Sequence, residues 1–254
     1  MYKIQIYVIT LKKKKDYIKT DNYKNLSKVT NKIILSKGVL LNKERSNKYL
    51  LYAKSPIGIS LAHINVWKKI RKNKEQMNDF SIILEDDTLL NIHYNEFINK
   101  INKIIENYNF DIYKIHSDFN SGFTSMAAYI INNKSIHKII NNHKIILGHL
   151  DFDLYILKLF NKIILLTHTE NLFITDENES TNRKDNYNIL RLLDNIKLSK
   201  RCDKNLRHLL TYKVFRFFNY EIIVFELILF VLLIISIIFK LKYLFFIIII
   251  LLIL

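Results

Sequence analysis

The chain of 254 residues contains a single cysteine, Cys202. This excludes an intrachain disulfide framework and a metal site built from a cysteine cluster. A lone thiol also fits a reducing compartment. The N-terminal stretch "MYKIQIYVITLKKKKDY" lacks the pattern of a secretory signal. Its apolar run is short and interrupted by Gln5, and its basic cluster follows that run instead of preceding it.

Proline and glycine are rare, with one and four residues, whereas lysine, asparagine and isoleucine are abundant. This bias indicates an AT-rich coding sequence, which raises the lysine count independently of function. The net charge of +16, from 39 Lys+Arg against 23 Asp+Glu, is therefore only partial evidence for an anionic partner. The chain is 50% hydrophobic, which excludes a disordered chain and supplies a sizeable core.

The C-terminal region carries little charge. Residues 222–254 contain only Glu226, Lys240 and Lys242 as charged side chains. The run "IIVFELILFVLLIISIIF" is 18 residues long, close to the roughly 20 that cross a bilayer as a helix. We therefore expect a membrane anchor over 222–254, either one tilted span or a hairpin or interfacial pair with the last apolar run. A basic connector, 197–221, would face anionic lipid, and the remaining domain would lie on the cytosolic side.

Residues 1–196 alternate between strand and helix patterns, which predicts one α/β domain. Apolar and β-branched runs predict strands, and apolar residues at helical spacing predict helices. The expected strands cover 2–10, 32–41, 80–87, 111–117, 126–132 and 162–168, and the expected helices cover 58–73, 94–108, 134–143 and 151–160.

The stretch "SIILEDDTLL", residues 81–90, places three acids at the end of a buried-strand pattern. Period-2 geometry puts Glu85 and Asp87 on one side of the strand end and Asp86 on the other. Two carboxylates on one side repel each other unless a cation lies between them. Oxygen ligands select a hard ion such as Mg²⁺ or Mn²⁺, which commonly also binds substrate phosphates. A solvated acidic turn is the alternative.

The chain resembles glycosyltransferase family 25, which includes lipopolysaccharide-type and procollagen galactosyltransferases. Four blocks carry the resemblance in the family's order over roughly residues 2–182. They are "IYVITLKKKKDY"; "GISLAHINVWKKI", with Gly58, Leu61, His63 and Trp67; "SIILEDD"; and "MAAYIINNKSIHKII" followed by "HLDFDLYI". The resemblance implies a GT-A-type fold, in which a mainly parallel sheet flanked by helices binds a nucleotide-sugar.

The resemblance also implies roles for the residues at the strand ends. Thr10 and Leu11 would lie near the nucleotide, with Asp86 in the same site. Glu85 and Asp87 would hold Mn²⁺ or Mg²⁺ under the diphosphate of a UDP-sugar donor.

The family inverts configuration, so a carboxylate should act as general base on the acceptor. Asp151 is the candidate, with Asp153 in reserve; the alternative for Asp151 is a helix N-cap. His63 would contact the diphosphate or act as a structural hydrogen-bonding residue, and Trp67 would be a core residue or a sugar platform. Further candidates are His116, Asp118, and the loop 178–186 with Arg183 and Lys184.

These observations predict a membrane-anchored, metal-dependent glycosyltransferase. It would move a hexose, such as galactose, from UDP to a glycan, a lipid-linked glycan or a hydroxylysine-bearing protein. Ser55-Pro56 and Ala62 depart from the family pattern, which favours the alternative of a non-catalytic membrane-tethered relative that binds glycan or a partner. Nucleic acid is not expected as a partner, because the lysines are spread along the chain and are not clustered among aromatic residues.

Overall fold

A computed structural model describes residues 2–30, 32–41, 54–72, 78–116, 126–144, 146, 149–168, 170–175, 188–193, 196, 206–217, 220–241, 243–244 and 247–248. The chain divides into two compact units. The first comprises Met1–Leu40 and Ile57–Glu179, and the second comprises Leu41–Pro56 and Ser180–Leu254. Each unit is described by itself.

The first unit is built on a six-stranded sheet with the order β2-β1-β3-β6-β5-β7. Three of its strand pairs are parallel (β1 with β2, β1 with β3, β5 with β7), and β6 runs antiparallel to both of its neighbours. The predicted mainly parallel sheet is thus confirmed. The strands are β1 (Ile4–Thr10), β2 (Ile33–Lys37), β3 (Phe80–Glu85), β5 (Ile112–Lys114), β6 (Ala128–Asn132) and β7 (Leu165–Thr167).

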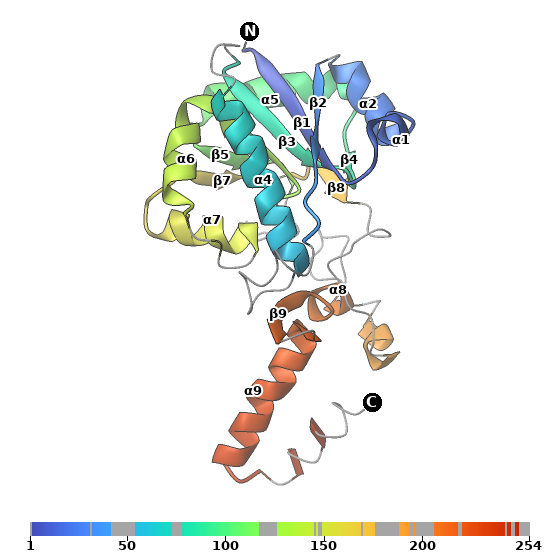
Figure 1. Ribbon diagram of the computed structural model, residues 1–254, viewed down its shortest axis with the longest axis vertical. Helices are drawn as coiled ribbons and strands as arrows, with labels where there is room; N and C mark the ends of the chain where they lie inside the picture. Colours follow the sequence, from blue (N-terminus) through green and yellow to red (C-terminus); the bar gives the residue numbers. More distant parts are fainter. Residues whose placement is uncertain are drawn as a thin grey trace. The chain divides into compact units, whose positions relative to one another are not determined.

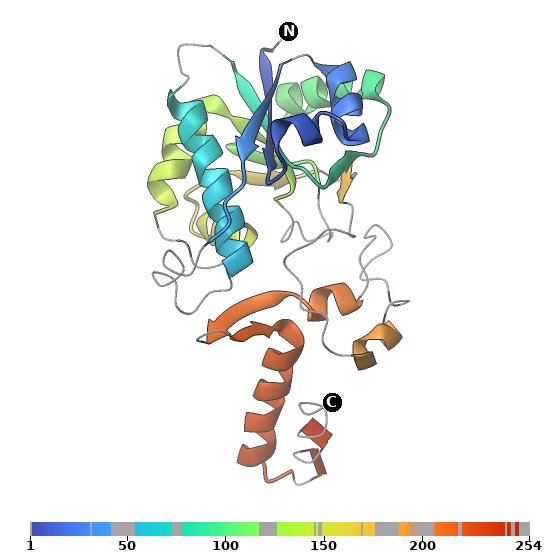
Figure 2. The same cartoon turned by 45° about the vertical axis from the view of Figure 1, so that its right-hand side comes forward.

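Helices cover both faces of this sheet (Figures 1 and 2). Side chains of α1 (Lys14–Tyr17), α2 (Asp21–Val29) and α5 (Tyr94–Asn107) pack into a core with Ile6 and Val8 of β1. We call this side of the sheet the α5 face.

The opposite side, which we call the α4 face, is covered by α4 (Lys54–Lys72), α6 (Ile136–Asn142) and α7 (Leu150–Leu159). Their side chains pack with Tyr7 and Ile9 of β1. Because successive side chains of a strand point to opposite faces, a strand covered on both faces is apolar throughout. This explains the apolar stretches at residues 6–9 of β1 and 82–84 of β3.

A small second sheet follows the acidic stretch. Its strand β4 (Thr88–Leu90) pairs antiparallel with β8 (Phe173–Thr175). The sequence patterns did not predict these short strands, nor did they predict α1 and α2, which lie in a lysine-rich segment.

The second unit contains η5 (Asn188–Leu193), α8 (Leu206–Leu210), a hairpin of β9 (Lys213–Phe217) and β10 (Tyr220–Ile223), and α9 (Val224–Ile238). Leu190 and Ile223 form the buried centre of a small apolar cluster. At the start of α9, Glu226 accepts a hydrogen bond from the backbone N–H of Ile223 at 2.9 Å and another from the Tyr220 hydroxyl.

The predicted membrane span over 222–254 is wrong for the part of the chain that the structure describes: no helix there is long and apolar enough to cross a membrane. The 18-residue apolar run is divided, because its first two residues belong to β10 and the helix begins only at Val224. The 15 residues of α9 extend about 22 Å, short of the roughly 30 Å hydrocarbon core. The helix is followed by a turn in which Lys240 has a positive φ of 54°.

Candidate functional site

The acidic stretch forms a tight turn at the carboxyl end of the parallel strands β1 and β3. Glu85 ends β3, and its backbone N–H donates to the carbonyl of Ala127 at 2.8 Å. The Thr88 hydroxyl donates to the Glu85 carbonyl at 2.6 Å, which closes the turn through Asp86 and Asp87. In sheets of this kind, ligands bind beyond the carboxyl ends of the strands. The turn therefore lies where a ligand site is expected.

Asp86 is held from β1. The hydroxyl of Thr10, the last residue of β1, donates to Asp86 Oδ2 at 2.5 Å and accepts the backbone N–H of Lys12 at 2.9 Å. On the same side, Asn22 Nδ2 donates to the Asp86 carbonyl at 3.4 Å. Burial raises the pKa of Asp86 and the charge of Glu85 adds to this, against the opposing effects of Thr10 and Lys12. Asp86 is thus a carboxyl group whose surroundings disfavour ionisation. Groups with perturbed pKa values are more frequent at functional sites than elsewhere.

Glu85 is held from the α4 face. The Nε2 atom of His63, in α4, lies 3.1 Å from Glu85 Oε1, and Nδ1 of the same ring lies 2.8 Å from the hydroxyl oxygen of Tyr129 in β6. Trp67, one helical turn after His63, donates from Nε1 to the same Tyr129 oxygen at 3.0 Å. Burial raises the pKa of Tyr129 well above its usual value, and the charges of Glu85 and Asp151 contribute.

His63 and Trp67 are both fully buried, at 0% exposure. The structure therefore places His63 as a hydrogen-bonding partner of Glu85, the structural alternative considered above, and not in the open site against a diphosphate. Trp67 is a core residue.

The two aspartates of α7 have different surroundings. Asp151 lies in the first turn of α7 after the N-cap residue His149, so it is not the cap. Its charge affects Tyr129, which places it on the α4 face with Glu85. Asp153 is buried at 3% exposure, and its Oδ2 lies 3.2 Å from His143 Nε2. This burial favours a structural role for Asp153 over the reserve catalytic role.

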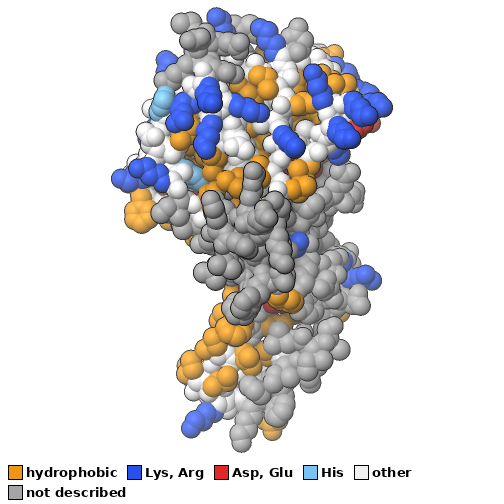
Figure 3. Space-filling model, viewed as in Figure 1, with side chains coloured by type: hydrophobic (Ala, Val, Ile, Leu, Met, Phe, Trp, Pro, Cys, Tyr) orange, Lys and Arg blue, Asp and Glu red, His pale blue; other side chains and the backbone are white. Residues whose placement is uncertain are grey.

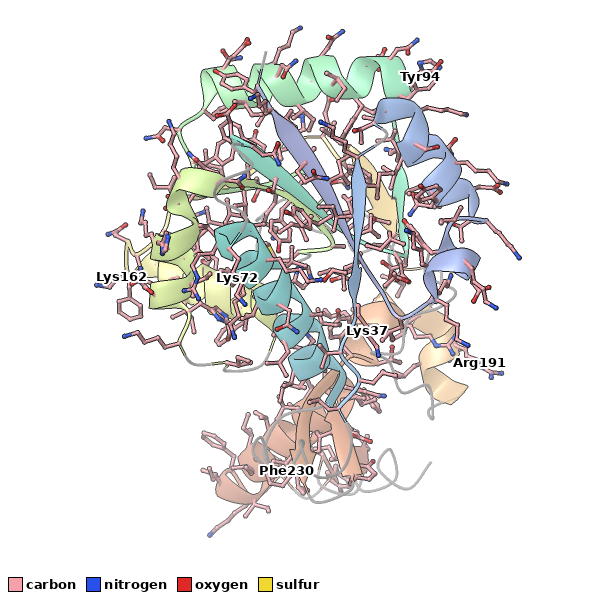
Figure 4. The ribbon with its side chains drawn as sticks, turned by 45° about the horizontal axis from the view of Figure 1, so that its top comes forward. Lys37, Lys72, Tyr94, Lys162, Arg191 and Phe230 are labelled. Atoms are coloured by element: carbon pink, nitrogen blue, oxygen red, sulfur yellow. The ribbon has the colours of Figure 1, made fainter. Side chains whose placement is uncertain are left out.

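The remaining predicted residues lie around the same edge. Leu11 is half exposed, and its side chain lies beside the Cα of Gly38. Lys37 ends β2 as the register partner of Thr10 and is labelled in Figure 4. His116 follows β5 and is buried. Asp118 and the loop 178–186 lie outside the described residues.

The donor chemistry of the acidic turn fits a hard divalent ion, because its side chains offer carboxylate oxygens. Within the described part of the chain, no group of three or more His, Cys, Asp or Glu side chains could hold a metal ion. An all-protein cage is therefore not present there. The turn fits an ion that takes one or two carboxylates and completes its coordination with phosphate oxygens and water.

Sequence reasoning predicted Glu85, Asp86 and Thr10 as site residues, and the structure brings Thr10 and Asp86 together; it did not predict the contact of Tyr129 with His63. Tyr129 was noted only as part of a motif, yet its hydroxyl connects α4 to the acidic turn. One signal was available: a tyrosine in the otherwise apolar strand "AYIIN" needs a partner for its hydroxyl when it is buried. That partner is His63 in α4, which is 66 residues away in the sequence.

These features define a mixed α/β domain with an acidic turn at the carboxyl ends of its parallel strands β1 and β3. No protein-family model and no curated protein matches the sequence, so the resemblance to family 25 is not confirmed.

Among solved structures, the fold is similar to a glycosyltransferase involved in the glycosylation of the major capsid of PBCV-1, with a TM-score of 0.44 and 12% identity over 65% of this chain and 81% of that one. It is also similar to a protein from STIV, with a TM-score of 0.39 and 8% identity over 72% and 99% of the two chains. A third is the glycosyltransferase GlyE of Streptococcus pneumoniae TIGR4, with a TM-score of 0.36 and 12% identity over 66% and 45%. At these values the similarity is too distant to assign a function, which must be argued from the site.

Proposed function

We propose that the first unit is a glycosyltransferase that uses a nucleotide-sugar donor, with a UDP-hexose as the first donor to test. One observation carries the proposal: hydrogen bonds from Thr10 and His63, and not lysine or arginine, hold the carboxylates of Asp86 and Glu85. Among the described residues, neither Glu85 nor Asp86 forms an ion pair with lysine or arginine. This is unexpected in a chain with a net charge of +16, whose Lys and Arg side chains are scattered over the face of the first unit drawn in Figure 3.

Lys12 lowers the pKa of Asp86 without forming such an ion pair, and we infer that the carboxylates of Glu85 and Asp86 remain for an external cation. Glu85 and Asp87 would hold Mn²⁺ or Mg²⁺, and such an ion would act as a Lewis acid that neutralises charge on the departing nucleoside diphosphate. Thr10 orients Asp86 from the end of β1, and His63 orients Glu85 from α4. Each hydrogen bond fixes a carboxylate before the ligand binds. Binding therefore costs little conformational entropy of these two side chains.

Asp151 would accept the proton of the acceptor hydroxyl, which then attacks the anomeric carbon of the donor with inversion. Its position in the first turn of α7 supports this, because the positive end of the helix dipole favours the ionised carboxylate. We propose that the acceptor hydroxyl belongs to a glycan, a lipid-linked glycan or a hydroxylysine side chain.

The test is donor turnover by the full chain, measured as UDP release from a panel of UDP-sugars in Mn²⁺ and in chelator. The proposal expects release that chelator abolishes. In Asp87→Asn we expect release to fall at least about 100-fold, as for loss of a group that stabilises developing charge, with the melting temperature unchanged. Glu106→Gln, which removes an exposed carboxylate at the far end of α5, serves as the charge-matched control and should retain activity.

UDP binding that is independent of metal, together with no release from any donor, would refute the enzyme. That result would favour a binding protein that keeps the fold without turnover.

A further inference from the structure

An unbroken series of hydrogen bonds crosses the α4 face beneath the acidic turn. It runs from Trp67 to Tyr129, then to His63 and finally to Glu85, with separations of 3.0, 2.8 and 3.1 Å. The first three side chains are fully buried, and only Glu85 reaches solvent. We call Trp67, Tyr129 and His63 the buried relay.

The chemistry of the two ends fixes the direction of every bond. The indole N–H of Trp67 can only donate, so the Tyr129 oxygen accepts from it. The Glu85 carboxylate can only accept, so His63 Nε2 must carry a proton. The Tyr129 hydroxyl proton then has one remaining acceptor among these groups, His63 Nδ1. If Nδ1 also carried a proton, two donors would meet the Tyr129 oxygen and its own buried proton would lack an acceptor, which is costly.

We propose that the buried relay positions Glu85 by directing the Nε2–H group of His63 at one carboxylate oxygen, so that this oxygen is fixed and the other is left for ligand. The role in ligand binding rests on the glycosyltransferase function proposed above; the hydrogen-bond direction does not.

A second contact connects the relay to α7. The Trp67 ring lies edge-on to His143, with ring centroids 5.5 Å apart, and His143 is bonded to Asp153. Asp153 is two residues after Asp151, the proposed base. Trp67 thus lies between His143, which is bonded to α7, and Tyr129 of β6, which is bonded to His63.

The direction of the hydrogen bonds in the buried relay is tested by NMR of the full chain with ¹⁵N-labelled histidine. Long-range ¹H–¹⁵N correlations distinguish the two neutral tautomers and the imidazolium. His63 is assigned in the wild-type chain, uniformly labelled with ¹³C and ¹⁵N, by through-bond correlations between its ring and its backbone. We expect the Nε2–H tautomer, with Nδ1 as acceptor. A proton on Nδ1 would overturn the proposal, because Nδ1 could then not accept from Tyr129, and this measurement requires no variant in the relay to fold.

Tyr129→Phe then tests positioning, because it removes the donor to Nδ1 while keeping the ring in the core. The His63 correlations should shift away from the single Nε2–H tautomer, and binding of UDP in the presence of Mn²⁺ should weaken about 10–100-fold, as for other partners that orient a metal ligand. Tyr113→Phe is the matched control: it breaks a similar hydrogen bond, between the Tyr113 hydroxyl and His168 Nδ1 at 3.1 Å, and should leave both the His63 correlations and UDP binding unchanged.

The outcomes separate the two proposals. Unchanged His63 correlations in Tyr129→Phe, or a shift without any loss of UDP binding, would overturn the positioning role. A wild-type chain with the expected tautomer that binds no UDP with Mn²⁺ would instead refute the proposed function, while the hydrogen-bond direction of the relay would stand.

Discussion

Gly58 is the position where adding one methyl group should disturb the site most directly. An alanine Cβ at this position would lie 2.4 Å from the Val39 carbonyl oxygen, about 1 Å inside ordinary van der Waals contact. That oxygen belongs to the backbone segment that follows β2, so it cannot rotate away as a side chain would. Gly58→Ala must therefore displace either α4 or this segment.

Two opposing effects determine the change in the free energy of unfolding. Overpacking of this kind lowers it by about 1–3 kcal/mol, and replacing glycine by alanine within a helix raises it by about 1 kcal/mol. We expect a net loss of about 1 kcal/mol, which lowers the melting temperature by about 2–4 °C for a chain of this size. The effect on the site should be larger, because α4 carries His63 and its bond to Glu85 is already 3.1 Å long.

The assay is thermal unfolding followed by circular dichroism, together with UDP binding in Mn²⁺. Gly38→Ala is the matched control. Its Cβ would meet the Leu11 side chain at 2.9 Å, and this flexible side chain can move. The control should be neutral or more stable by up to about 1 kcal/mol, since alanine reduces the entropy of the unfolded chain. Equal stability of Gly58→Ala and Gly38→Ala would refute the reasoning.

Two further predictions concern stability. Burial alone raises the pKa of Asp111, but hydrogen bonds from Lys138, Ser135 and the Ile164 backbone outweigh it, and the net pKa is lowered. The ionised Asp111 carboxylate therefore stabilises the folded state above the unfolded pKa of about 3.9. This stabilisation is lost as the pH falls through the lower pKa of the folded state. In urea titrations, Asp111→Asn should cost about 1–3 kcal/mol at pH 7 and weaken the acid dependence; an unchanged acid dependence would contradict this. Trp67→Phe should cost about 1–3 kcal/mol, because the Tyr129 oxygen loses its indole donor, whereas wild-type stability would mean that this bond contributes nothing.

Local patterns were sufficient for most elements of the first unit. The apolar runs predicted β1 and β3, and the recurrence of Phe97, Ile101 and Ile104 predicted α5, which the structure places at Tyr94–Asn107. The segment of α1 and α2 was missed because it is rich in lysine and buries few side chains, among them Tyr17 and Leu26. The same local reasoning failed at the C-terminus. There, one apolar run is divided between a strand and a helix, a boundary that hydropathy does not detect.

The sequence by itself determined that this chain has strands with apolar side chains on both faces, that three acids lie at the end of one strand, and that Asp151 lies in the first turn of a helix. These properties depend on residues close together along the chain, whose spacing alone decides which face a side chain occupies. Only the tertiary structure decided that β6 runs antiparallel beside β3, and that it places Tyr129 between Trp67 and His63. The sequence could not decide this, because a hydrogen bond depends on atoms about 3 Å apart in space, and these atoms belong to elements that folding alone brings together.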